Sequence, residues 1–153
     1  MKRKYWVLTG VLTVIISLVI GLLSRSVGYE ALSDSIDINM GLKLKPSKVL
    51  VTRQPLKLPI TIENYSEKER QIKVALREPF VYEDGYKALD NNDRISVAQD
   101  ESVIQAGSKI AYTVEIEKIS DNKEVWLSVQ EVVESGLAQE LILKILINGK
   151  TKK

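Results

Sequence analysis

A short polar stretch in the second half of the chain holds the residues with the plainest potential for catalysis. Ser120 and Lys123 ("SDNK") match the S-x-x-K spacing with which some acyl-transfer enzymes pair a nucleophilic serine with a lysine. In those enzymes the pattern opens a helix of a large α/β domain and works with two further motifs. Here it lies in a polar turn among strand-like segments, so we interpret the match as chance and predict that the protein is not an enzyme.

The composition removes most other catalytic and metal chemistry. The chain of 153 residues has no His and no Cys, which excludes imidazole bases, thiolate nucleophiles, disulfides and most zinc sites. Residues 90–93 ("DNND") offer oxygen ligands but lack the spacing, the glycine and the closing Glu of a calcium loop. Turn chemistry explains that stretch equally well, as it explains the glycosylation sequon at 64–66 ("NYS"). We therefore predict no metal, no cofactor and no small-molecule substrate.

Two apolar features remain as candidates for binding. Residues 141–147 ("LILKILI") are hydrophobic apart from one lysine, so this last strand is either a sheet edge that pairs with a partner or a strand buried on both faces. The sequence alone favours burial. Phe80, Tyr82 and Tyr86 are either an exposed aromatic anchor or packing residues of one hairpin, and we favour the hairpin.

The elements that position these residues follow a period of two, the pattern of β-strands. Alternating hydrophobic residues mark segments near 36–44, 49–51, 56–62, 72–76, 95–97, 110–116, 125–129 and 141–147. Asp84-Gly85 predicts a type I′ hairpin turn. Ala106 and Gly107 predict a corner at which the chain leaves one sheet and enters the other, with Gly107 at positive φ.

These segments predict one all-β domain over residues 36–149, an immunoglobulin-like β-sandwich of about seven strands. Residues 24–35 are small and polar and predict a linker. Residues 150–153 predict a solvated tail.

The N-terminal segment predicts a membrane anchor. Residues 5–23 are uncharged, and as a helix they would span roughly 28 Å, close to the hydrocarbon thickness of a bilayer. Three basic residues precede the run in the tip 1–4 and only Arg25 follows it closely, which predicts a cytoplasmic N-terminus and an extracytoplasmic domain. A cleaved signal peptide is the alternative, although the run is longer than the usual apolar region of such peptides.

The charge distribution limits the class of partner. The net charge is +2, and the excess of positive charge lies in the first 33 residues, which leaves the rest of the chain close to neutral. A near-neutral domain lacks the basic surface of nucleic-acid-binding proteins. We therefore expect a protein partner in addition to the membrane.

The order of the segments resembles the N-terminal domain of periplasmic pilus-assembly chaperones, in the PapD-like group of immunoglobulin folds. The similarity is one of pattern and lies in the stretches at 44–51 ("LKPSKVLV"), 58–76, 93–117, 121–133 and 137–149 ("LAQELILKILING"). The resemblance implies a PapD-like sandwich whose last strand pairs with a fibre subunit.

The resemblance also implies a set of partner-binding residues. In that family a first-strand arginine and a late-strand lysine grip the C-terminal carboxylate of the subunit, and Lys48 falls at the first position. The second position falls on Leu146 in the preferred register, with Lys144 two residues earlier. The last strand would supply Leu137, Leu141 and Leu143 to the partner, although Gln139 interrupts that alternation.

The sequence thus predicts a membrane-anchored, extracytoplasmic protein-binding module that assists assembly of surface fibres or envelope proteins through an edge strand. The alternative is a structural subunit, either pilin-like or a stator component of the envelope, whose N-terminal helix packs in a filament or membrane complex.

Overall fold

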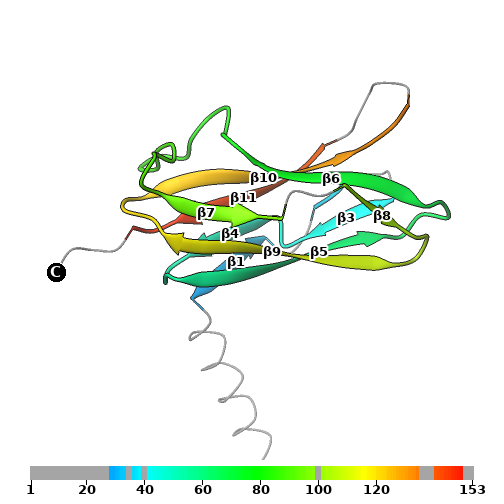
Figure 1. Ribbon diagram of the computed structural model, residues 1–153, viewed down its shortest axis with the longest axis horizontal. Coiled ribbons are helices and arrows are strands. Elements are labelled where there is room, and N and C mark those ends of the chain that lie inside the picture. Colours follow the sequence, from blue (N-terminus) through cyan, green and yellow to red (C-terminus); the bar gives the residue numbers. More distant parts are fainter. Residues whose placement is uncertain (1–27, 34–35, 39–40, 99–100, 135–139, 150–153) are drawn as a thin grey trace, which may run out of the picture.

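Two β-sheets packed face to face form the domain in the computed structural model (Figure 1). The structure describes residues 28–33, 36–38, 41–98, 101–134 and 140–149. The predicted anchor, basic tip and polar tail lie outside these ranges. Among the described residues, no helix is long and apolar enough to cross a membrane.

The described residues form eleven strands in two sheets. The first sheet has the order β1 (Tyr29–Ser33), β4 (Lys48–Val51), β11 (Glu140–Ile147), β10 (Lys123–Glu131), β6 (Arg70–Arg77) and β8 (Glu101–Ile104). The second sheet has the order β2 (Ile36–Ile38), β3 (Leu42–Lys45), β5 (Leu56–Asn64), β9 (Lys109–Lys118) and β7 (Arg94–Val97). The predicted all-β sandwich is confirmed, with more strands than the hydrophobic pattern indicated.

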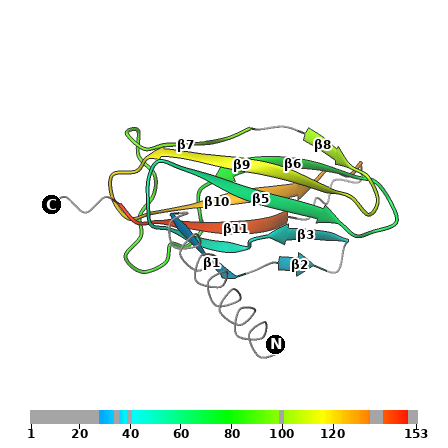
Figure 2. The ribbon, with the colours of Figure 1, turned by 90° about the horizontal axis from the view of Figure 1, so that it is seen from below.

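The additional strands arise at the edges of the sandwich. Residues 29–33, in the predicted linker, form β1, which pairs with β4 (Figure 2). The predicted segment 36–44 forms two strands of the second sheet, β2 and β3, and Pro46 lies between β3 and β4 of the first sheet. Proline has no N–H to donate to a ladder, so the chain changes sheets at this residue.

The core consists of the inward-facing residues of both sheets. Alternation along β5, β9, β10 and β11 places a hydrophobic side chain between the sheets at every second position. The fully covered members include Leu44, Leu58, Ile60, Ile62, Ile72, Ile116, Leu127, Leu143, Ile145 and Ile147.

Two turns test the sequence predictions directly. Gly107 has φ of 73° in the turn between β8 of the first sheet and β9 of the second, so the predicted sheet-changing corner is confirmed. Asp84-Gly85 does form a turn, closed by a hydrogen bond from Tyr86 N–H to the Glu83 carbonyl. Only Gly85 has positive φ, so this is not a type I′ turn, and no strands flank it. The predicted hairpin is therefore wrong.

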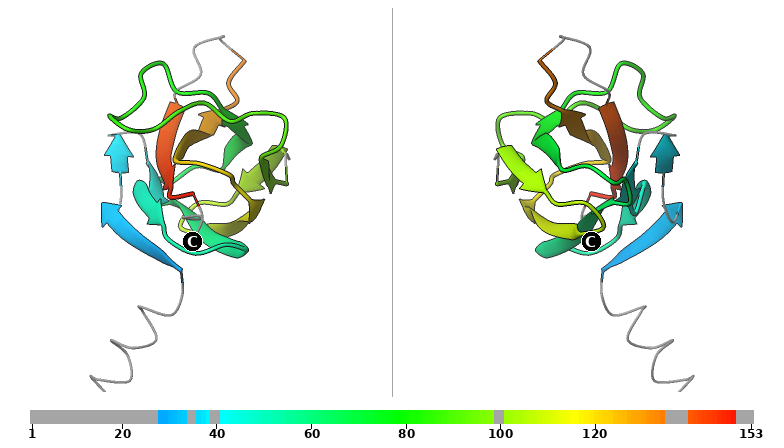
Figure 3. Two further views of the ribbon diagram at one scale, coloured as in Figure 1. Left: turned by 90° about the vertical axis from the view of Figure 1, so that its left-hand side faces the viewer. Right: turned by 90° about the vertical axis from the view of Figure 1, so that its right-hand side faces the viewer.

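Residues 78–93 form a long loop between β6 and β7, which we call the cover loop (Figure 3). It lies against the outer face of the first sheet, where the Glu83 N–H donates to Glu124 Oε2 at 2.6 Å and the Tyr86 hydroxyl donates to Asn148 Oδ1 at 3.0 Å. The Lys87 N–H donates to the Asn122 carbonyl in the turn before β10, and the Lys87 carbonyl accepts from the N–H of Glu124 in β10. The loop brings side chains from the middle of the chain onto β10, β11 and β4.

Candidate protein-binding site

Lys48 and Lys144 meet on the outer face of the first sheet. Strand β4 runs parallel to β11, and the register places Lys48 directly opposite Lys144. The same register pairs Leu146, the position that the resemblance gave to the second cation, with Leu50. Leu146 is buried at 3 % exposure, whereas both lysines keep about a third of their side-chain surface accessible. We call Lys48 and Lys144 the lysine pair.

One carboxylate from the cover loop lies between the two ammonium groups. Glu83 Oε1 is 2.5 Å from Lys48 Nζ and 3.6 Å from Lys144 Nζ. The hydrogen bond from Lys48 lowers the pKa of the Glu83 carboxyl, the charges of both lysines lower it further, and partial desolvation opposes them. Like charges directly opposite each other on paired strands repel, so the lysine pair needs an anionic partner. Glu83 was not foreseen, because nothing in its local sequence shows that it reaches β4 and β11.

Beside the lysine pair is a shallow pocket of about 380 Å³. Trp126 of β10 and Ile142 of β11 provide its apolar surface, and Ser33, Ser47 and the lysine pair complete it. The Trp126 indole is fixed by its N–H, which donates to the buried Glu124 carboxylate at 2.9 Å. Ile142 was not predicted, although the unbroken run at 141–147 was a signal, because it places apolar side chains on the outer face as well.

The first half of β11 has an unpaired edge next to this pocket. Strand β10 pairs with β11 along Glu140–Ile147, but β4 pairs only with Lys144–Ile147. Lys144 N–H donates to the Ser47 carbonyl at 3.1 Å, so the N–H and C=O groups of Ile142, two residues earlier, point to the same side. No strand among the described residues pairs with that side of Glu140–Leu143, which we call the half-edge.

Two of the three predicted hydrophobic contact residues point into the sandwich and not to the outer face. Leu141 and Leu143 face the core and are 5 % and 0 % exposed. In a strand each side chain faces opposite to its neighbour, so the accessible side chains of β11 are those of Glu140, Ile142 and Lys144. Leu137 lies outside the described residues. Its binding role stays a prediction.

Aromatic and cationic side chains continue the surface toward β6. The Phe80 ring lies edge-on to Trp126 with centroids 5.8 Å apart, and the Arg77 guanidinium lies 4.3 Å from the centre of the Phe80 ring. Phe80 remains 78 % exposed and its neighbour Val81 is 75 % exposed. The expected packing of Phe80 within its own hairpin is therefore wrong, since the residue contacts a different strand and leaves most of its surface accessible.

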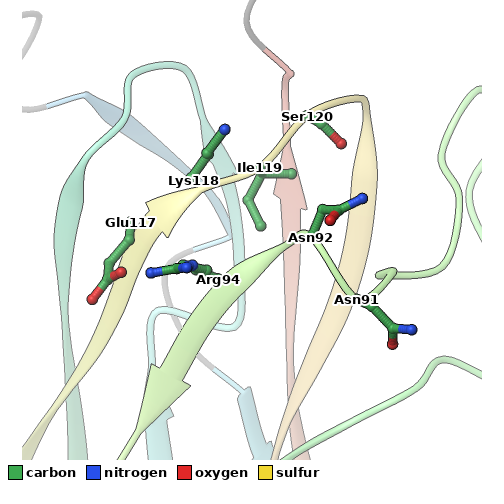
Figure 4. Close-up of a pocket in the computed structure, with 7 residues that line it drawn as sticks. All are labelled: Asn91, Asn92, Arg94, Glu117, Lys118, Ile119 and Ser120. Atoms are coloured by element: carbon green, nitrogen blue, oxygen red, sulfur yellow. The ribbon is translucent and has the colours of Figure 1, made fainter.

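A second pocket, of about 840 Å³, lies at one end of the sandwich (Figure 4). Its lining is mainly polar and includes Arg94, Glu117 and Ser120. The Ser120 hydroxyl donates to Asp93 Oδ1 at 3.3 Å, and Lys123 hydrogen bonds to the Ala88 carbonyl and Asp90. This pocket lies between the turn at Asn91-Asn92, the edge strand β7 and the end of β9, and it holds no pair of lysines opposite each other.

The S-x-x-K residues beside this pocket do not form a nucleophile and base. Burial opposes the charge of Lys123, but its hydrogen bond to Asp90 and the charge of Asp93 outweigh burial and raise its pKa. A lysine held in its protonated form does not accept the serine proton. In the part of the chain that the structure describes, no group of acidic side chains is arranged to hold a metal ion.

The "NYS" stretch is a structural turn. Asn64 is fully buried, its amide group donates to the carbonyls of Lys68 and Ile104, and its oxygen accepts from Ser66. A side chain enclosed in this way is not accessible to a glycosylating enzyme.

Comparison with known proteins gives a result at the level of structure alone. No protein-family model matches the sequence, and no curated protein sequence matches it. The YadV chaperone is similar in structure, with 15 % identity, a TM-score of 0.54, and coverage of 74 % of this chain and 54 % of YadV. A chain of the CsuC–CsuE chaperone–tip adhesion subunit pre-assembly complex of Acinetobacter baumannii matches with 15 % identity, a TM-score of 0.52, and coverage of 70 % and 51 %.

The PapD-like domain 7 of human CEP192 matches as well, with 8 % identity, a TM-score of 0.55, and coverage of 77 % of this chain and 95 % of that domain. The chain therefore spans about half the length of the chaperone chains and nearly all of the single domain. Similarity at such identities establishes architecture and leaves activity open, since one fold serves many functions. The resemblance inferred from the sequence is confirmed at this level: the chain has the PapD-like fold.

Proposed function

We propose that this protein is a non-enzymatic, chaperone-like module that captures an extended segment of another protein. The observation that carries the proposal is the convergence of three features within one site: the lysine pair, the apolar pocket on Trp126 and Ile142, and the unpaired half-edge of β11. Together they supply a charge, a side-chain pocket and backbone hydrogen bonds, which are the components of recognition by strand addition.

The geometry defines how such a segment would lie. Its backbone would pair with the half-edge, and a terminal carboxylate would lie at the lysine pair. Since Lys144 follows the half-edge along β11, a segment that ends there runs parallel to β11. A side chain near its terminus would enter the pocket on Trp126 and Ile142.

The comparisons support a surface-fibre or envelope subunit as the partner. The related solved structures include a chaperone bound to a tip adhesion subunit before assembly. The transfer of that role to this chain rests on the lysine pair and the half-edge, since the fold is shared with a human domain as well.

We further propose that residues 5–23 anchor the protein in the membrane with the domain on the extracytoplasmic side. The support is the uncharged run and the basic residues before it. Placed in this way, the domain would hold a partner close to the membrane surface.

Site-specific photo-crosslinking in cells tests the proposal. A photoreactive residue at Ile142 should yield an adduct with a partner, and the same group at Val103, an exposed position on β8 at the far edge of this sheet, should not. Lys48→Glu should abolish the Ile142 adduct. Lys57→Glu, an exposed lysine of the other sheet, should leave it intact.

Leu141→Glu is unsuitable as a test of the site, because a charge there would enter the core and unfold the domain. Equal adducts from Ile142 and Val103, or an Ile142 adduct that survives Lys48→Glu in a folded variant, would overturn the proposed site. Adducts formed only between copies of this chain would favour the structural-subunit alternative.

A further inference from the structure

The lysine pair already holds a carboxylate, and that carboxylate does not come from a neighbouring strand. Arg77 and Glu140 form a salt bridge from within the sheet at 2.6 Å. Glu83, in contrast, reaches the lysine pair from the cover loop, and 35 residues separate it from Lys48. The site is therefore occupied from outside the sheet by a group of the type that we propose for the partner.

The cover loop is attached to the sheet by contacts that do not use this carboxylate. The Glu83 N–H bonds to Glu124, the Tyr86 hydroxyl bonds to Asn148, and Lys87 forms backbone hydrogen bonds to Asn122 and Glu124. The Glu83 side chain can rotate about its own χ angles while its backbone stays in place. Its side chain is 32 % exposed, so a path to solvent is open.

Exchange of one carboxylate for another costs little at such a site. If Glu83 left alone, Lys48 and Lys144 would face each other without an anion, which is unfavourable for paired strands. If an incoming carboxylate replaces it, the charge balance is kept. The departing Glu83 becomes hydrated at the surface, where its net contribution to the ion pair was small in the first place.

From these contacts we infer that Glu83 is an internal competitor of the partner: it occupies the lysine pair in the free protein and is displaced by the carboxylate of the captured segment. This inference rests on the proposed function. It adds a regulatory element that the proposed function does not contain.

Competition by Glu83 favours ligands that make further contacts in addition to the one between their carboxylate and the lysine pair. Glu83 is tethered next to the lysine pair, so its effective concentration there exceeds that of a small carboxylate in solution. A segment that also pairs with the half-edge and fills the pocket gains contacts that Glu83 does not make. Only such a segment displaces Glu83 at modest concentration, which protects the lysine pair from the many free carboxylates around the cell.

The test uses the full-length protein in detergent with Trp6→Phe, so that Trp126, the other of the two tryptophans, reports on the pocket. The probe is a capped hexapeptide of alternating threonine and valine that ends in phenylalanine with a free carboxylate. The same peptide with a terminal amide is the control ligand. Fluorescence titration gives Kd for Glu83→Gln, for the parent and for Glu78→Gln, which removes one charge from an exposed position of the same loop.

Glu83→Gln should bind the carboxylate peptide about two- to fivefold more tightly than the parent, because a surface ion pair no longer competes. It should bind the amide peptide unchanged, and Glu78→Gln should match the parent with both peptides.

A parent that prefers the carboxylate peptide, together with a Glu83→Gln variant that binds it no more tightly, would overturn the competition and leave the proposed function intact. Loss of folding in Glu83→Gln, measured by thermal melting, would also overturn it, because the loop would then depend on that carboxylate. An equal gain in affinity of Glu83→Gln for both peptides would indicate that the substitution loosens the cover loop, and it would overturn the exchange of carboxylates. The absence of any preference for the carboxylate in either protein would overturn the proposed function itself.

Discussion

Neighbouring residues on β11 should respond in opposite ways to truncation, and this contrast tests the strand register. Leu143 is fully buried between the sheets, whereas Ile142 lines the pocket on the outer face. Leu143→Ala removes a core side chain and leaves a cavity, which costs about 3 kcal/mol of unfolding free energy. Ile142→Ala removes a partly buried side chain of the outer face and should cost about 1 kcal/mol or less.

For a domain of this size one kcal/mol corresponds to about 4 °C in Tm. Thermal melting followed by far-UV circular dichroism should therefore show a fall of about 12 °C for Leu143→Ala and no more than about 4 °C for Ile142→Ala. Partner capture should follow the reverse order. Ile142→Ala should weaken it several-fold, because the pocket loses its apolar surface, and Leu143→Ala should leave it intact at temperatures where the variant is folded.

The opposite outcome has a specific meaning. A slip of one residue in a strand exchanges its two faces. If Ile142→Ala destabilised the domain by the larger amount while Leu143→Ala weakened capture without loss of stability, the register of β11 would be wrong, and the pocket on Trp126 would not exist as described. Equal effects of both variants on Tm would refute the argument as well.

Three further outcomes follow from the described contacts. Asn64→Ala should lower the unfolding free energy by about 3 kcal/mol in urea titration, because the buried groups that Asn64 bonds lose their partner. Gly107→Ala should cost only about 1 kcal/mol by the same assay, since no atom lies within 4 Å of an added Cβ and backbone strain at φ of 73° is the sole penalty. The folded-state pKa of Glu83 is lowered, so its contribution to stability is present at neutral pH and is lost as the pH falls from about the ordinary value of 4.5 through the folded pKa. The difference in urea stability between the parent and Glu83→Gln should therefore shrink as the pH falls below 4.5. A difference that stays constant with pH would show that Glu83 does not form the ion pair with the lysine pair.

The sequence pattern predicted the sandwich because alternation of hydrophobic residues is a local property. The corner at Gly107 could be placed for the same reason, since a positive-φ glycine between two alternating segments needs no knowledge of distant residues. The turn at Asp84-Gly85 was recognised, but its hairpin was not formed. The residues around it contact β10 and β11 and do not form a pair of strands with each other.

The candidate site could be predicted only in part, because its components meet through long-range pairing. Lys48 and Lys144 were both named from the sequence. They lie directly opposite each other because β4 pairs in parallel with β11. Hydrophobic alternation does not show which strands pair or in which register. Leu141 and Leu143 point into the core because their face of β11 meets the other sheet, and the sequence does not show which face that is. Glu83 depends on the path of the cover loop, which no local pattern specifies.

The size of the half-edge implies that, in the proposed capture, backbone pairing alone would not hold a segment and the lysine pair would have to contribute. Within Glu140–Leu143 only Glu140 and Ile142 direct their backbone groups outward, which allows up to about four hydrogen bonds to a partner strand. At about 0.5–1.5 kcal/mol net for each bond, backbone pairing supplies roughly 2–6 kcal/mol. Association costs at least about 4 kcal/mol in lost translational and rotational freedom.

Strand pairing at the described half-edge therefore comes close to cancelling the cost of association, and the balance must come from the pocket and the lysine pair. A hydrogen bond to a charged group contributes about 1.5–3 kcal/mol, from which the contribution of the displaced Glu83 ion pair, about 0.2–1 kcal/mol, is subtracted. This amount is sufficient to separate a segment that ends in a carboxylate from an internal strand of the same sequence. In the proposed capture, the lysine pair would therefore make the site selective for a chain terminus, and occupation by Glu83 would set the affinity that such a terminus must exceed.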